Sequence, residues 1–131
     1  MSDKPLRIFL VDDNEIDLIV NEKLLRISGL TDTVERFASA TDFLQRFDGL
    51  VDASSYRNVL LLDIMMPGLN GFECAQAISE RPAERRAGFQ VFVLSSSIDR
   101  NDIARASAIP LVGRVLEKPL DTYLLKGLIN P

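Results

Sequence analysis

The sequence predicts an α/β fold in which a doubly wound, five-stranded parallel sheet carries helices on both faces. Strand-like and helix-like segments alternate five times along the 131 residues, which favours βαβ units. Three of the strand-like segments are apolar throughout, as is typical of strands that are covered on both faces. Hydrophobic residues make up 47% of the chain and charged residues 26%, so the composition is that of a globular domain with its own core.

The expected strands and helices follow one another along the whole chain. The first strand is an almost unbroken apolar run, and the apolar spacing then becomes helical until Gly29 provides a stop. The second strand is more polar and so lies nearer an edge, and Ser39 or Thr41 can cap the helix after it. In order, we expect strands at 6–11, 33–38, 58–62, 89–95 and 113–117, and helices at 15–28, 39–47, 71–81, 99–108 and 120–129.

The later elements are separated by prolines, glycines and polar runs. The third strand is an apolar run that ends at Asp63, and turn residues follow it. Pro82 ends the third helix, and residues 83–88 form a polar loop before a fourth strand that is rich in Val and Phe. Pro131 follows the last helix at once, so we expect a single domain over residues 1–131.

The composition excludes several classes of function. The net charge is −4 without a dense run of lysines and arginines, which argues against nucleic-acid binding. The chain has no histidine, so histidine-dependent catalysis and a phosphohistidine of its own are excluded. Cys74 is the only cysteine, so neither an internal disulfide nor a cysteine zinc site can form. Without a signal-peptide pattern or a membrane-spanning stretch, we expect a cytoplasmic protein that does not bind membranes.

Polar residues follow the strands at the edge of the sheet where ligands bind. The common doubly wound order of five strands is 2-1-3-4-5, and ligands bind at the carboxyl ends of strands where the order reverses, here between strands 1 and 3. Asp12 and Asp13 follow the first strand, and Asp63 follows the third. Ser95 closes the fourth strand and Lys118 the fifth. We therefore expect these side chains at one crevice.

These residue types suit the transfer of a phosphoryl group. Three carboxylates close together repel one another unless a hard divalent cation such as Mg²⁺ neutralises them. A hydroxyl and an ammonium beside them would hydrogen-bond and neutralise the phosphoryl oxygens. Asp63 could then act as a nucleophile and form an acyl phosphate.

Four short segments of the chain form a set: FLVDDNEIDL, LLLDIMMPGLNGFE, VFVLSSS and VLEKPL. In this order and at these spacings they resemble the receiver domain of two-component response regulators, including stand-alone regulators of the chemotaxis type. The resemblance runs from about Leu6 to Ile129. It implies a flavodoxin-like (βα)5 fold and a single receiver domain without an output domain.

The resemblance also implies roles for individual residues. The implied site consists of Asp63 as the phosphoacceptor, Lys118 and Ser95 on the phosphoryl oxygens, and Asp12 or Asp13, Asp63 and the backbone carbonyl of Met65 on the metal. The metal would be Mg²⁺, with Mn²⁺ able to substitute. The bond between Lys118 and Pro119 would be cis, which is rare among X–Pro bonds in general.

The implied function is that of a signalling switch. The phosphoryl donor would be a phosphohistidine on a sensor histidine kinase or on a histidine phosphotransfer protein. The chain would catalyse its own phosphorylation and dephosphorylation without acting as an enzyme on a diffusible substrate. Phosphorylation would switch a binding surface for a downstream protein, which the sequence does not identify, or would pass the group on in a phosphorelay.

Plainer interpretations exist for each residue and for the chain. Asp12 and Asp13 could cap the first helix, Asp63 could be a turn residue and Lys118 a solvated lysine. Ser95 could be an ordinary loop serine, with Ser96 in its place at the site. A receiver-like interaction module with a vestigial site is the main alternative function. A phosphatase would need a second aspartate two residues after the nucleophile, and a flavin-binding protein would need a phosphate-binding loop after the first strand; the chain has neither.

Two features depart from the family pattern. Val115 stands where family members often carry Tyr or Phe, three residues before the lysine, so the chain lacks the aromatic residue of the usual relay from Ser95 to the surface. Ser97 and Met65 lie where the family tunes the hydrolysis of the acyl phosphate, and neither is an acid or an amide that could orient water. We therefore expect a phosphoryl lifetime longer than seconds.

Overall fold

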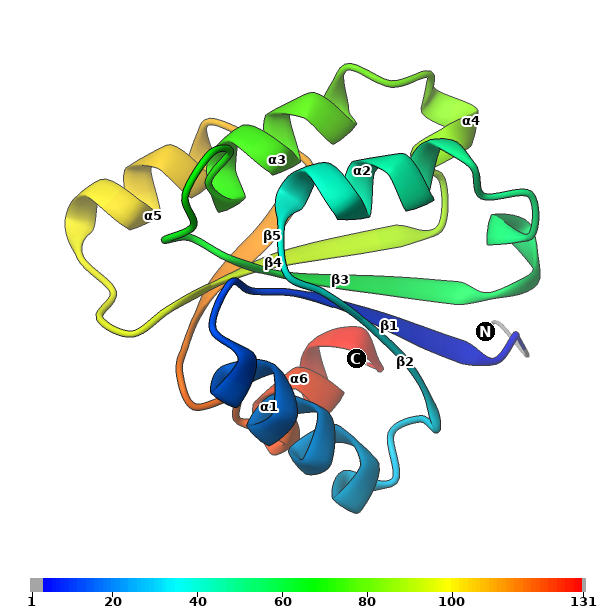
Figure 1. Ribbon diagram of the computed structural model, residues 1–131, viewed down its shortest axis with the longest axis horizontal. Helices are drawn as coiled ribbons and strands as arrows, with labels where there is room; N and C mark the ends of the chain where they lie inside the picture. The colour runs from blue at the N-terminus through cyan, green and yellow to red at the C-terminus, as the bar shows by residue number, and fades with distance from the viewer. Residues whose placement is uncertain (1–3, 131) are drawn as a thin grey trace.

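The computed structural model describes residues 4–130 as a five-stranded parallel sheet between two layers of helices (Figure 1). The strands lie in the order β2-β1-β3-β4-β5, so the predicted doubly wound fold is confirmed. The strands are β1 (Leu6–Val11), β2 (Thr33–Phe37), β3 (Arg57–Asp63), β4 (Phe89–Ser95) and β5 (Val112–Glu117). The helices are α1 (Glu15–Ser28), α2 (Ala40–Asp48), α3 (Gly71–Ser79), α4 (Ala83–Arg86), α5 (Arg100–Ser107) and α6 (Thr122–Ile129), with a 3-10 turn at Ala53–Ser55.

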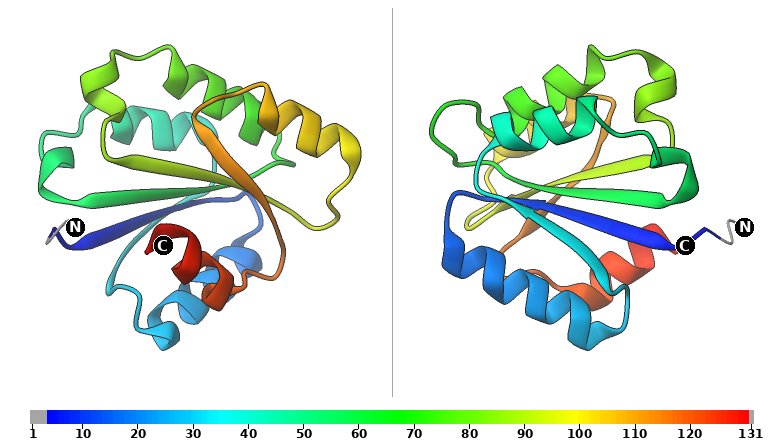
Figure 2. Two further views of the ribbon diagram at one scale, coloured as in Figure 1. Left: turned by 180° about the vertical axis from the view of Figure 1, so that it is seen from behind. Right: turned by 45° about the vertical axis from the view of Figure 1, so that its right-hand side comes forward.

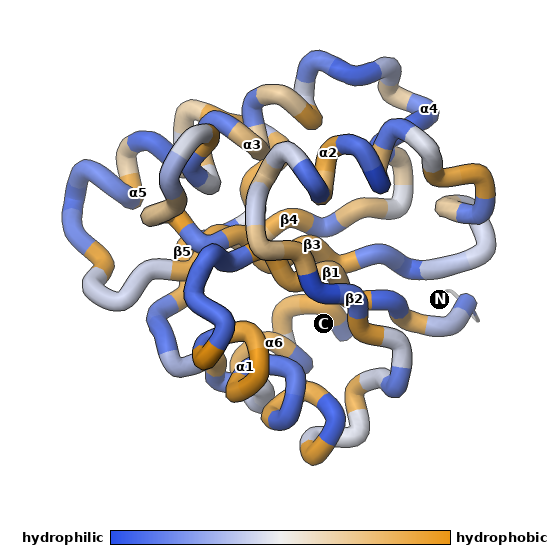
Figure 3. Tube along the Cα trace, viewed as in Figure 1, coloured by the Kyte–Doolittle hydropathy of each residue, from blue (hydrophilic) through white to orange (hydrophobic). Residues whose placement is uncertain are grey.

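The helices cover the sheet on both faces: α2, α3, α4 and α5 lie on one face, and α1 and α6 on the other (Figures 1 and 2). Each layer of helices packs against the sheet through its own hydrophobic cluster. Successive residues along a strand belong alternately to one cluster and to the other. In β3, Leu60 and Leu62 belong to the first cluster, and Val59 and Leu61 to the second. All four are fully buried, which explains the unbroken apolar run along this central strand (Figure 3).

The second strand lies at an edge of the sheet, as its polar sequence predicts. β2 pairs with β1 alone, in parallel register from Thr33 opposite Arg7 to Phe37 opposite Val11. None of its residues is fully buried, whereas five of the six residues of β1 are. An edge strand has one neighbour and one exposed side, so it needs fewer apolar residues.

The helices begin and end at the expected kinds of residue. The side chain of Asn14 accepts the N–H of Asp17 at 3.1 Å at the start of α1, and that of Ser39 accepts the N–H of Asp42 at 3.1 Å in α2. Ser39 is therefore the cap of the two candidates. Gly29 ends α1 with a φ of 76°, in the left-handed region that glycine adopts readily. Within residues 4–130, no helix is both long and apolar enough to cross a bilayer.

The predicted polar loop at 83–88 is partly wrong, because Ala83–Arg86 form the single helical turn α4. Pro82 precedes this turn with a φ of −54°, and alanine, glutamate and arginine are good helix formers. Arg85 donates a hydrogen bond to the Asp48 carbonyl at 2.8 Å, so α4 is attached to the end of α2.

One arginine lies inside the fold, near the start of β1. The guanidinium group of Arg7 lies over the rings of Tyr56 and Phe9, at 4.1 Å and 5.1 Å from their centroids. It also donates to Asn58 Oδ1 at 3.0 Å and to Asp52 Oδ1 at 3.1 Å. These contacts offset part of the cost of removing water from the charge, while Nη2 of the same group is buried without a hydrogen-bond partner among the described residues.

Candidate functional site

Three carboxylates meet at the carboxyl ends of β1 and β3. Asp12 and Asp13 follow β1 directly, and Asp63 is the last residue of β3. One carboxylate oxygen from each lies within 4.8 Å of the other two. Asp12 and Asp63 are buried, whereas Asp13 is exposed. The strand order therefore brings these residues together at the edge where ligands bind in such folds.

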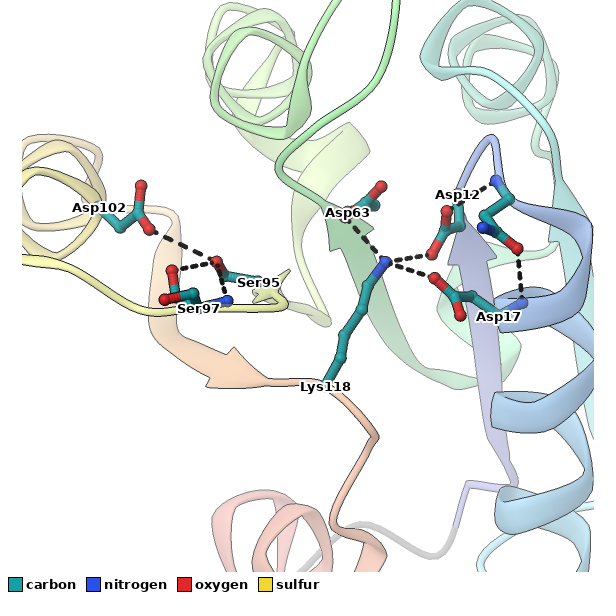
Figure 4. A network of polar contacts seen from close by, with 8 residues as sticks. Asp12, Asp17, Asp63, Ser95, Ser97, Asp102 and Lys118 are labelled. Carbon is teal, nitrogen blue, oxygen red and sulfur yellow. Dashed lines mark hydrogen bonds and ion pairs between the residues drawn. The ribbon is translucent and has the colours of Figure 1, made fainter.

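The ammonium group of Lys118 reaches the same point from the end of β5 (Figure 4). Its Nζ lies 2.8 Å from Asp12 Oδ2, 2.9 Å from Asp17 Oδ2 and 3.0 Å from Asp63 Oδ1. The backbone N–H of Lys118 donates to the Ser95 carbonyl at 2.8 Å, which fixes the base of the side chain beside β4.

Negative charge is in excess at this site. Burial, and then the neighbouring Asp12, raise the pKa of Asp63 to about 6, although Lys118 opposes the rise. Burial alone would lower the pKa of Lys118, but its hydrogen bonds to three carboxylates outweigh burial and raise it. Lys118 is therefore a constant positive charge, while the ionisation of Asp63 is costly without additional positive charge.

The donor set fits a hard divalent cation. Asp12, Asp13 and Asp63 offer carboxylate oxygens, which Mg²⁺ prefers to nitrogen or sulphur ligands. A cation here would also relieve the excess negative charge that contributes to the raised pKa of Asp63. Cys74 is buried in the cluster under α3, and burial raises the pKa of its thiol to about 12, so it offers no thiolate.

Asp12 and Asp13 do not cap α1, so that interpretation of the pair is wrong. The cap is Asn14, whose side chain accepts the N–H of Asp17. Asp12 Oδ1 accepts the backbone N–H of Asn14 at 2.9 Å. This hydrogen bond orients the Asp12 carboxylate and leaves its second oxygen to Lys118.

The loop after β3 packs against the backbone of Asp63. The N–H of Gly71, the first residue of α3, donates to the Ile64 carbonyl at 3.2 Å. A Cβ at Gly71 would lie 2.5 Å from the Asp63 carbonyl oxygen, closer than a side chain can approach. Between these points the side chain of Met65 is 77% exposed, while that of Met66 is buried. The loop is thus fixed at its ends and open to solvent at Met65.

The hydroxyl of Ser95 faces a different layer of helices from the Asp63 carboxylate. In β4, Val91 and Val93 belong to the cluster under α2, α3 and α5, and Ser95 continues this alternation. Asp63 instead continues the alternation of Leu61, which faces α1 and α6. The two side chains therefore leave neighbouring strands on opposite sides of the sheet.

The contacts of Ser95 agree with this direction. Its Oγ donates to the Ser97 carbonyl at 2.8 Å and accepts the Ser97 N–H at 3.2 Å (Figure 4). It also lies 3.5 Å from Asp102 Oδ2 of α5. Lys118 and Ser95 are both expected on the phosphoryl oxygens. Within residues 4–130, Lys118 contacts Asp63, whereas the contacts described for the Ser95 hydroxyl are with Ser97 and Asp102.

Asp17 is not among the residues expected at the site, although its carboxylate contacts Lys118 at 2.9 Å. An acidic residue in the first turn of a helix is common, because it interacts favourably with the helix dipole. Its position in the sequence could have identified it, because the first turn of the helix that follows β1 lies next to the point where the strand order reverses.

A family model described as the response regulator receiver domain matches residues 8–130. The chain belongs to this family. The match runs from β1 to the last residue described and includes every residue of the site above.

This receiver domain is similar to plant response regulators. It is 32% identical over 131 residues to the two-component response regulator ARR6 of Arabidopsis thaliana, covering 95% of this chain and 63% of that protein. It is 33% identical over 132 residues to ARR5 of the same plant, covering 95% of this chain and 65% of that protein. The chain therefore spans a little under two thirds of the length of these curated relatives.

Solved receiver structures resemble this one over nearly the whole chain. A response regulator receiver protein from Dyadobacter fermentans shares 37% identity with a TM-score of 0.88, and the match covers 95% of this chain and 94% of that one. A two-component response regulator from Cytophaga hutchinsonii shares 28% identity with a TM-score of 0.87, covering 97% and 96%.

Two further details concern the β5 side of this receiver domain. The peptide bond between Lys118 and Pro119 is cis, which confirms the prediction from the motif. A groove of about 390 Å³ lies between α5 and β5, and Ile103, Ala106 and Val115 are among its lining residues. Val115, in place of the frequent aromatic residue, thus forms part of an open groove.

Proposed function

We propose that this receiver domain accepts a phosphoryl group on Asp63 from a phosphohistidine of a sensor histidine kinase or a histidine phosphotransfer protein, with Mg²⁺ required. The observation that carries the proposal is the Lys118 ammonium, 3.0 Å from Asp63 and 2.8 Å from Asp12 at the carboxyl edge of the sheet. A buried ion pair contributes little net stability, because desolvation offsets the attraction. Chemistry at the site is the better explanation of these charges.

The reaction exchanges one bond to phosphorus for another. A carboxylate oxygen of Asp63 forms a bond to phosphorus while the phosphorus–nitrogen bond of the phosphohistidine breaks, and the bonding electrons leave with the imidazole. The protein positions the groups and neutralises charge. Lys118 donates hydrogen bonds to the oxygens of the transferred phosphoryl group. The Ser95 hydroxyl can reach these oxygens only if it gives up its hydrogen bond to the Ser97 carbonyl.

The chain supplies oxygen ligands for the metal. The proposed ligands are Asp12 or Asp13, Asp63 and the backbone carbonyl of Met65, and Mn²⁺ can substitute for Mg²⁺. When bound, the metal supplies positive charge that stabilises the charge on the phosphoryl oxygens. Asp63 must be ionised to attack phosphorus, and positive charge beside it favours the ionised form.

Phosphorylation would have one of two consequences. It would switch a binding surface for a downstream protein, or the group would be passed on in a phosphorelay. Three expectations stay predictions from the sequence. They are the cytoplasmic location, the lack of nucleic-acid and membrane partners, and the single receiver domain over residues 1–131 without an output domain.

Phosphorylation of the intact protein by acetyl phosphate tests the proposal. With Mg²⁺, we expect the native protein to gain the mass of one phosphoryl group, and EDTA to prevent the gain. Asp63→Asn should gain none, whereas Asp42→Asn, which changes an exposed aspartate of α2, should behave as the native protein does. No gain by the native protein would favour the vestigial interaction module. A gain that persists in Asp63→Asn would place the acceptor elsewhere.

A further inference from the structure

We propose that Asp17 is a positioning residue for phosphoryl transfer: its carboxylate holds the Lys118 ammonium while Asp12 and Asp63 are engaged in the reaction. The inference rests on the proposed function. It adds to the site a residue that lies within the first motif but has no role implied by the family resemblance. It starts from the contact between Asp17 Oδ2 and Lys118 Nζ at 2.9 Å.

The ammonium of Lys118 has three N–H donors, and three carboxylates lie within hydrogen-bond distance of it (Figure 4). These carboxylates come from different elements: the end of β1, the first turn of α1 and the end of β3. A phosphoryl oxygen can accept a hydrogen bond from Lys118 only when one of these contacts is given up.

Two of the three contacts belong to groups that the reaction uses. The acyl phosphate forms on a carboxylate oxygen of Asp63, which removes the negative charge of that carboxylate and frees the N–H directed at it. Asp12 is one of the three carboxylates that fit a divalent cation, and it already accepts the backbone N–H of Asn14. The contacts of Lys118 with both residues therefore weaken when the site is in use.

Asp17 has no such second role. It lies outside the group of three carboxylates, and the contact described for its side chain is the one with Lys118. Its backbone is held in place, because its N–H donates to the side chain of Asn14 at 3.1 Å. A lysine side chain has a long flexible stem, so a fixed anion beside the ammonium limits it to positions near Asp63.

A plainer role for Asp17 is to stabilise the N-terminus of α1 through the helix dipole. Asp42 provides a matched control, because it occupies the same position in α2. Its N–H donates to the cap Ser39 as that of Asp17 does to Asn14, and its side chain is exposed. A role at the helix terminus alone would therefore affect both variants alike.

The first measurement is the rate of phosphorylation by acetyl phosphate with Mg²⁺, followed by intact mass. We expect Asp17→Asn to lower the rate constant roughly 10-fold, because Lys118 is less well placed, and Asp42→Asn to leave it unchanged. In a Lys118→Met background, followed over longer times, Asp17→Asn should have no further effect, because Asp17 acts through Lys118.

The second measurement is the side-chain ammonium signal of Lys118 in ¹⁵N-labelled protein, assigned by its loss in Lys118→Met. A buried, hydrogen-bonded ammonium exchanges slowly with water, so the native protein and Asp42→Asn should both show the signal, with and without Mg²⁺. In Asp17→Asn we expect the signal to be lost or strongly broadened when Mg²⁺ is present.

Each outcome decides the proposal. An unchanged or faster rate in Asp17→Asn would overturn it, and so would an unchanged Lys118 signal in Asp17→Asn with Mg²⁺ or equal losses in Asp17→Asn and Asp42→Asn. If the native protein takes up no phosphoryl group, the proposed function fails, while the Lys118 signal still decides whether Asp17 holds the ammonium.

Discussion

The substitution Asp63→Asn should stabilise the metal-free protein. Asp63 is 5% exposed, and burial followed by the charge of Asp12 raises its pKa to about 6. An amide has nearly the same shape without the charge. After the substitution, the Lys118 ammonium still has Asp12 and Asp17 as partners, at 2.8 Å and 2.9 Å.

The magnitude follows from the pKa of Asp63. Because the folded-state pKa of Asp63 lies above the ordinary carboxyl value of 3.8, the protonated carboxyl stabilises the fold at low pH, and this stabilisation is lost as the pH rises through about 6. Each pH unit between the two values corresponds to about 1.4 kcal/mol, so ionisation costs up to about 3 kcal/mol at neutral pH. An amide does not reproduce every contact of the protonated carboxyl group, so we expect a net gain of about 1–2 kcal/mol.

Urea denaturation in EDTA measures this gain as a free energy of unfolding. The gain should be largest above about pH 7, should shrink between about pH 6 and pH 4, and should fall when Mg²⁺ is added, because the metal stabilises the native carboxylate set. Asp42→Asn serves as the control and should stay within about 0.5 kcal/mol of the native protein. A loss of stability for Asp63→Asn in EDTA at neutral pH, or a gain that does not change with pH, would refute the reasoning.

Three further predictions concern packing, a buried charge and the lifetime of the phosphorylated state. Gly71→Ala should lower the free energy of unfolding by about 1–3 kcal/mol, since its Cβ would lie 2.5 Å from a backbone oxygen. Gly127→Ala, in α6 with nothing within 4 Å, should raise it by about 0.5–1 kcal/mol, and equal effects of the two in urea would contradict the packing argument. Arg7→Lys should lower the free energy of unfolding by about 2 kcal/mol, because a lysine cannot reproduce the planar contact of the guanidinium with the Tyr56 ring. Arg26→Lys, at an exposed ion pair, should change it by less than about 0.5 kcal/mol. Similar values for the two variants would contradict this expectation. The acyl phosphate should outlast several seconds after the donor is removed, because no acid or amide stands two residues after Asp63 to orient water; intact mass against time would show a shorter half-life if this is wrong.

The fold could be predicted because its main signals are local and repeated. Apolar runs at 58–62 and 89–95 and the helical spacing over 15–28 each span enough residues for their period to show. The approach of Asp12 to Asp63 could be predicted for a different reason, since it depends on strand order rather than on side-chain detail. A helix of four residues, such as α4, is too short for a 3.6-residue period to appear.

The direction of Ser95, the contact of Asp17 and the choice of the first helix cap could not be predicted, because they depend on geometry that the motifs do not carry. The Ser95 hydroxyl is directed by the alternation of β4 and by its hydrogen bonds to Ser97. Asp17 and Lys118 are 101 positions apart in the sequence, and the strand order together with the packing of α1 beside α6 brings them together. The choice of Asn14 over Asp12 as the helix cap likewise depends on where β1 ends.

The alternation along the strands makes the sheet a partition between two separate hydrophobic compartments. Within the sheet, a side chain belongs to one compartment or to the other. This separation ends at the rim, where the Asp63 carboxylate is directed toward the compartment of α1 and α6 and the Ser95 hydroxyl toward that of α2, α3 and α5. A phosphoryl group on Asp63 would stand on the rim itself, between an ammonium on one side and a hydroxyl on the other. One small anion could then contact groups that lead into both layers of helices at once.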